Sequence, residues 1–135
     1  MKTSKVIKAV LFVSGLIAMV IGGYILIIPT AFYLTYGIDL GTNISMLNEI
    51  RASGGALLAT GILIFSGAFL SRMTFTSLVV ATFLYLAYGL SRILSTTIDG
   101  TPTEGLVQAS ILEIVIGLVC VFALVKYQDI QKEEI

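Results

Sequence analysis

The chain has 135 residues, of which 57% are hydrophobic and 12% are charged, and its formal net charge is zero. Soluble domains average about 25% charged residues. A chain this short cannot bury so much apolar surface in a water-soluble core, so that surface has to face lipid. A zero net charge also argues against nucleic-acid binding through a basic face. We expect a single integral membrane domain that covers residues 1–135.

Histidine and cysteine, which often act as metal ligands, bases or nucleophiles, are nearly absent. The sequence has no histidine and one cysteine, Cys120, which lies in an apolar run. Zinc, haem and Ser-His-Asp sites therefore lose their usual ligand or base, and no intrachain disulfide can form. We expect no metal and no cofactor, and we interpret Cys120 as a small packing residue.

Four segments are apolar enough to cross a bilayer, whose core of about 30 Å needs roughly 20 helical residues. The predicted spans are residues 7–28, 46–70, 75–96 and 102–126. The apolar run of the first span starts at Ala9, after three lysines, but it is longer than a usual signal-peptide core, so we expect this span to stay uncleaved. Backbone groups in lipid must be satisfied within a segment. The sequence thus predicts an all-α, antiparallel up-down four-helix transmembrane bundle.

The first connection, residues 29–45, is long and contains Phe32, Tyr33 and Tyr36. Aromatic residues of this kind are typical of the membrane interface. Two interpretations remain open for this stretch: a short interfacial segment packed over the bundle, or an ordinary loop.

The two later connections are short. Residues 71–74 predict an antiparallel hairpin between the second and third spans. Asp99-Gly100 is a turn signal that predicts the end of the third helix. The run Thr-Pro-Thr-Glu at 101–104 predicts a capping box for the fourth span, with Thr101 as the N-cap.

The positions of lysine and arginine predict the orientation. They lie in the N-terminal segment, the second connection and the C-terminal tail, namely Lys2, Lys5, Lys8, Arg72, Lys126 and Lys132. The first connection before Asn48 and the third connection have none. Because basic residues are enriched in cytoplasmic segments, we expect both termini to be cytoplasmic (N-in/C-in).

Small residues recur at helical spacing on three spans. Such residues let helix backbones approach closely in lipid, where association depends on packing. The sets are Ser14, Ala18 and Gly22; Gly55 and Ala59; and Ala109 and Gly117.

In this topology three charged residues fall in the outer half of the membrane. Arg51 lies near the outer start of the second span, Arg92 near the outer end of the third, and Glu113 about 10 Å into the fourth. A charge at the bilayer centre costs roughly 2.5–3.5 kcal/mol, so Glu113 should have a partner. Arginine forms paired hydrogen bonds with carboxylates. We predict that Glu113 pairs with Arg92, Arg51 or both.

Other polar residues accompany these arginines. Tyr85 and Tyr88 share a helical face with Arg92, and Asn48 lies one turn before Arg51. One interpretation is that the charges hold the bundle together.

The other interpretation is a ligand-binding pocket, open to the outside, that contains Arg51, Arg92, Glu113, Tyr85, Tyr88 and Asn48. Two arginines against one glutamate would suit an anionic lipid head group or a small acid. Glu49 would cancel that excess if it turned inward.

Several short motifs occur in a recognisable order along the chain. They are Pro29 with Tyr36-Gly37-Ile38, Asn48-Glu49-Ile50-Arg51-Ala52-Ser53-Gly54-Gly55, Gly89-Leu90-Ser91-Arg92 with Ser95 and Asp99-Gly100, and Leu112-Glu113 with Gly117. This set, from about Val6 to Lys126, resembles a bacterial family of four-helix membrane proteins known only as a domain of unknown function. More loosely, it is similar to DoxX-like bundles.

The resemblance implies a four-helix bundle. We expect the protein to reside in a bacterial cytoplasmic membrane. The resemblance also suggests that Arg51, Arg92 and Glu113 are characteristic polar positions of the family. It implies no activity.

The sequence therefore indicates no reaction. We expect a non-enzymatic accessory protein of the membrane, acting as a homo-oligomer or with a partner in a membrane complex. The alternative is a binder or carrier of a lipid or small anionic ligand. An enzyme would need Glu113 as an acid or base with Tyr85 or Tyr88 nearby, and we expect none.

Overall fold

The computed structural model describes residues 3–135. Four long helices make up most of it: α1 (Lys5–Ile27), α3 (Ile44–Ser66), α4 (Thr74–Asp99) and α5 (Glu104–Glu133). A short helix, α2 (Pro29–Leu34), follows α1, and a 3₁₀ turn, η1 (Ser71–Met73), precedes α4.

All four long helices have the length and apolarity of membrane spans. The predicted all-α four-helix transmembrane bundle is confirmed, and the chain is an integral membrane protein. The helix ends differ from the predicted spans by a few residues, most at the C-terminus, where α5 continues to Glu133. This extension passes beyond the apolar run because a helix can continue into water with polar residues such as Gln128 and Asp129.

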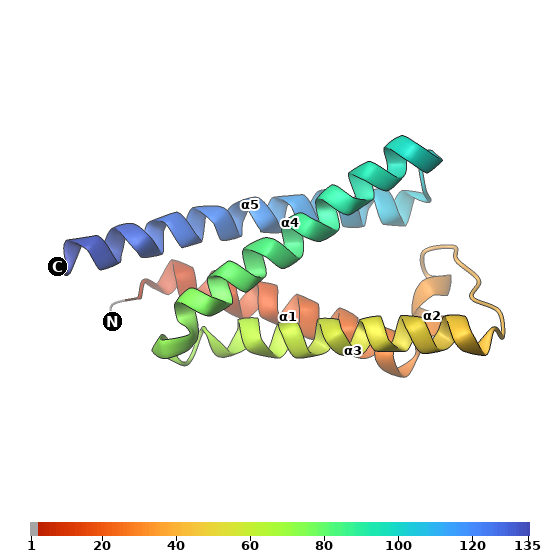
Figure 1. Ribbon diagram of the computed structural model, residues 1–135, viewed down its shortest axis with the longest axis horizontal. Helices are drawn as coiled ribbons and strands as arrows, with labels where there is room; N and C mark the ends of the chain where they lie inside the picture. Colours follow the sequence, from red (N-terminus) through yellow and green to blue (C-terminus); the bar gives the residue numbers. More distant parts are fainter. Residues whose placement is uncertain (1–2) are drawn as a thin grey trace.

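The bundle is built from two antiparallel pairs, α1 with α3 and α4 with α5 (Figure 1). The pairs meet where both termini lie and diverge at the other end, near α2. We call these the closed end and the open end. The closed end contains both termini and η1, and the open end contains α2 and the α4–α5 turn at residues 100–103.

The first pair is tight because glycines remove side chains from its crossing. A Cβ added to Gly22 of α1 would lie 2.4 Å from the Leu58 nitrogen of α3, and one added to Gly54 would lie 2.7 Å from the Leu26 nitrogen. These separations are too short for any side chain. The predicted packing of Gly22 is thus observed.

On α3, however, the predicted packing face is wrong. Gly55 and Ala59 do not form the close contact with α1: Ala59 is exposed, and a Cβ on Gly55 would meet only a methyl of Leu26 of α1, at the ordinary contact distance of 3.8 Å. The buried face carries Gly54 and Gly61 instead. The adjacent glycines at 54–55 made the wrong face look equally plausible.

Among the described residues, the larger of two buried hydrophobic clusters lies at the closed end and draws on all four long helices. Its buried residues are Ile7, Leu11, Ile64, Ala68, Leu78, Ala81, Cys120, Ala123 and Tyr127. Ser77 of α4 donates a hydrogen bond to the Leu63 carbonyl of α3 at 2.8 Å, which ties the two pairs together there. Cys120 is fully buried in this core, in keeping with a packing role.

The first connection contains the helix α2, so part of it is the packed segment that one interpretation expected. Pro29 occupies the start of α2, where its missing N–H costs no hydrogen bond. Asp99 is the last residue of α4, as its turn signal predicts, and Gly100 follows with φ of 101°.

The predicted capping box at residues 101–104 is wrong. Helix α5 begins at Glu104 with Thr103 as the N-cap, and no side chain caps it. The Thr103 hydroxyl instead donates to the Tyr36 carbonyl at 2.8 Å. A contact with the first connection, distant in sequence, has taken the place of the local cap.

Candidate functional site

The divergence of the two helix pairs leaves a cavity of about 760 Å³ at the open end. Residues from all four long helices and from α2 line it. Along α4 the lining extends from Leu84 to Ser95, a rise of about 16 Å at 1.5 Å per residue. Half of a bilayer core is about 15 Å. The lining therefore extends along α4 over a length similar to the thickness of one lipid leaflet.

The polar side chains of the lining lie in the half nearer the open end, where they alternate with apolar ones such as Ile25, Phe32 and Leu106. We call these polar side chains the polar rim: Tyr33, Thr35, Tyr36, Ser53, Tyr88, Ser91, Arg92, Ser95, Gln108 and Glu113. Apolar side chains and one tyrosine close the deeper part, and we call them the floor: Ile17, Ala18, Leu57, Leu84, Tyr85 and Ile116.

An ion pair between α4 and α5 forms the centre of the rim. Arg92 Nε donates to Glu113 Oε2 at 2.7 Å, and Arg92 Nη2 donates to Oε1 at 3.1 Å. The side chains are 31% and 17% exposed, respectively. The predicted pairing of Glu113 with Arg92 is confirmed. Because both carboxylate oxygens are engaged, the geometry fixes both side chains.

Small residues make room for this pair on α5. Gly105, Ala109 and Glu113 succeed one another at intervals of four, and all three line the cavity. Nearby, Gly117 packs against Leu86 of α4, where an added Cβ would lie 2.5 Å from a leucine methyl. The close approach of α4 and α5 below the cavity thus brings Glu113 within reach of Arg92.

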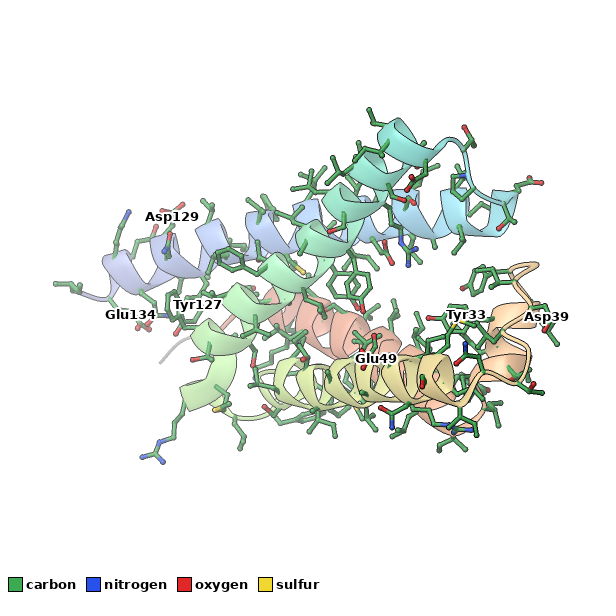
Figure 2. The ribbon with its side chains drawn as sticks, turned by 45° about the vertical axis from the view of Figure 1, so that its right-hand side comes forward. Tyr33, Asp39, Glu49, Tyr127, Asp129 and Glu134 are labelled. Carbon is green, nitrogen blue, oxygen red and sulfur yellow. The ribbon has the colours of Figure 1, made fainter. Side chains whose placement is uncertain are left out.

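Tyrosines surround the arginine. The Arg92 guanidinium carbon lies 5.8 Å from the centre of the Tyr88 ring, within the range of a cation–π contact. Tyr33 comes from α2, at the end of the molecule opposite Tyr127 (Figure 2). Burial raises the pKa of the Tyr33 phenol above its ordinary 10.0, and nearby Tyr88 adds to the rise. Tyr33 is therefore a neutral hydroxyl that can both donate and accept.

Tyr85 closes the cavity towards the core. Its side chain is buried, and its hydroxyl donates a hydrogen bond across the bundle to the Ser14 carbonyl of α1. The Ser14 hydroxyl bonds within its own helix, to the Val10 carbonyl at 2.6 Å. Tyr85 thus lines the site, as predicted, but its polar atom faces α1.

Arg51 and Asn48 lie elsewhere. Arg51 Nη1 donates to the Leu26 and Ile27 carbonyls at 2.6 and 3.0 Å, at the C-terminal end of α1. Those carbonyls have no partner within the helix, and the helix dipole makes them favourable for a cation. Arg51, Asn48 and Glu49 are exposed and are not among the described residues that line the cavity.

Of the six residues predicted for the site, four line the cavity: Arg92, Glu113, Tyr85 and Tyr88. The sequence predicted Arg51 near Glu113 because both were expected in the outer half of the membrane. It could not foresee that the partner of Arg51 is a backbone carbonyl.

Sequence reasoning missed several rim residues, including Tyr33, Tyr36 and Gln108. The two tyrosines were recognised only as interfacial aromatics. Tyr36 lies over Gly105 of α5, where an added Cβ would be 2.9 Å from the ring. With the Thr103 hydrogen bond, this contact makes residues 35–37 a strap that joins the two helix pairs across the open end.

Comparison with known proteins identifies the family of the chain but assigns it no activity. A family model described as "Domain of unknown function (DUF4345)" matches residues 6–124. No curated protein and no solved structure matches the chain.

Proposed function

This chain belongs to the DUF4345 family, whose description assigns no activity, and we propose that it binds a small amphiphilic molecule in the cavity at its open end. The observation that carries the proposal is the cavity itself, which has a polar rim above an apolar floor. Such a gradient matches a molecule with a polar head and an apolar tail.

The size of the cavity supports a ligand rather than a packing fault. Sites for small molecules measure about 300–1,000 Å³ and combine apolar walls with a few placed polar groups. The cavity has about 760 Å³ and both kinds of lining.

If the ion pair served only to join α4 to α5, no cavity would be needed beside it. The interpretation of the charges as bundle glue accounts for the contact of Arg92 with Glu113. It does not account for the hydroxyls and the amide that face the same volume from α2, α4 and α5.

Binding is proposed here rather than catalysis. The acid–base candidate, Glu113, has both oxygens engaged by Arg92. A general base must reach a substrate proton within about 2.6–3.2 Å, and the pair with Arg92 leaves one lone pair on each Glu113 oxygen for such a contact. The structure therefore directs this carboxylate chiefly at Arg92.

We further propose that the open end faces outward from a bacterial cytoplasmic membrane, with both termini in the cytoplasm. Arg72, Lys126 and Lys132 belong to the closed end and support this orientation. In a Cys120→Ala background, a membrane-impermeant maleimide should label Thr101→Cys in intact cells and should leave Gln128→Cys unlabelled. The reverse pattern would invert the topology.

The test of binding is native mass spectrometry of protein extracted mildly from its own membrane, comparing two matched variants. Ala109 of α5 lines the cavity, whereas Ala87 of α4 is exposed and is not among the lining residues. Ala109→Phe should fill the cavity, and Ala87→Phe should leave it open.

We expect the wild type and Ala87→Phe to retain a small amphiphile and Ala109→Phe to lose it. Retention by all three proteins would place the molecule elsewhere. A second protein at fixed ratio, or a defined homo-oligomer without any small molecule, would overturn the proposal in favour of an accessory role in a complex.

A further inference from the structure

The positive and the negative charge in the cavity lining balance each other, and this balance determines which class of head group the cavity suits. Among the described lining residues, only Arg92 and Glu113 carry formal charge, and they face each other in a closed pair. The net charge of the lining is therefore zero. The expected excess of positive charge does not arise, because Arg51 lies at the end of α1.

We propose that the ligand of this cavity is an amphiphile whose head carries no net charge, either an uncharged hydrogen-bonding head or a zwitterion. The inference rests on the proposed binding function and names the chemical class that the site takes.

An anion gains little at this site. A negative group that reached Arg92 would also lie close to the Glu113 carboxylate, since the two side chains are in contact at 2.7 Å. Attraction and repulsion then nearly cancel. The cost of moving a charge out of water into a membrane-embedded cavity remains without compensation.

A head without net charge finds suitable partners. Arg92 Nη1 makes no hydrogen bond within the described part of the chain, so it is available to donate. The hydroxyls of Tyr33 and Ser91 and the amide of Gln108 can each donate and accept. Carbonyl, hydroxyl and amide groups use such partners without bringing charge, and a zwitterion can align with the dipole of the ion pair.

The experiment uses three single-chain lipids with one acyl chain and different heads. Purified full-length protein is delipidated in mild detergent and offered equal amounts of a monoacylglycerol, a lysophosphatidylethanolamine and a lysophosphatidylglycerol. The bound ratio is read by native mass spectrometry. We expect the wild type to prefer the monoacylglycerol or the zwitterion over the anionic lysophosphatidylglycerol by about tenfold.

Charge variants separate electrostatics from structure. Glu113→Gln exposes the charge of Arg92 and should shift the ratio by about tenfold towards the anionic lipid. The double variant Arg92→Gln/Glu113→Gln has a neutral lining again and should return to the wild-type preference. Glu49→Gln removes an exposed carboxylate outside the lining and should change nothing.

The outcomes also separate the two proposals. If none of the three lipids binds the wild type, the binding function itself fails. If the wild type binds the anionic lipid as well as the others, or if Glu113→Gln leaves the ratio unchanged, the binding function stands and the assignment of head-group class is overturned. The wild-type comparison remains decisive even where a variant does not fold.

Discussion

The pair Arg92–Glu113 should contribute measurably to the stability of the bundle, and its contribution can be isolated. Two unit charges about 4 Å apart attract by roughly 4 kcal/mol at an effective dielectric constant of about 20. Removing the pair from water offsets part of that gain. With side chains 31% and 17% exposed, the pair is neither fully buried nor at the surface. We therefore expect a coupling free energy of about 1.5–3 kcal/mol, the range for hydrogen bonds to charged groups.

A double-mutant cycle measures this coupling. The free energy of unfolding is determined in mixed micelles for wild type, Arg92→Gln, Glu113→Gln and the double variant, with helix content followed by circular dichroism. Each single variant leaves one charge without its partner, so each should lose about 2–3 kcal/mol. The double variant should lose less than the sum of the two. Glu49→Gln, on an exposed carboxylate, should lose under about 0.5 kcal/mol.

A coupling below about 0.5 kcal/mol would refute the reasoning, because that is the value of a solvated surface pair. It would mean that water reaches the two groups freely and that the pair does not set the electrostatics of the cavity. The assignment of head-group class would then lose its physical basis.

Two further predictions concern the helix crossing and the rim. Gly22→Ala should lower the free energy of unfolding by about 1–3 kcal/mol, because its Cβ would lie 2.4 Å from the Leu58 nitrogen. Gly23→Ala, whose Cβ would meet nothing within 4 Å, should be tolerated, and equal losses in the two variants would contradict the observed crossing. The raised pKa of Tyr33 means that the folded state holds its proton more tightly, so wild type should lose stability relative to Tyr33→Phe as the pH rises past 10.0. A difference that stays constant from about pH 9 to about pH 11 would show that burial does not shift this group.

Much of the site could be expected from the sequence for a simple reason. A charge within an apolar helix needs a partner, and few candidates exist at the same depth. The sequence therefore predicted an arginine partner for Glu113, either Arg92, Arg51 or both, and Tyr88 followed from its place one turn before Arg92. The predicted role of Arg51 in the site had the same basis and is not supported, because a backbone carbonyl carries no signature in the sequence.

The sequence by itself determined the elements: four apolar helices, their up-down order, and the helix end at Asp99. These follow from hydropathy and local backbone preference, which act within one turn or one span. Only the tertiary structure decided how the helices associate in two pairs, one tight through Gly22 and Gly54. It also decided that the pairs diverge around a cavity and that Tyr36 contacts Gly105 of α5. In lipid, helix association depends on the detailed fit of surfaces, and many pairings of apolar helices satisfy hydropathy equally well.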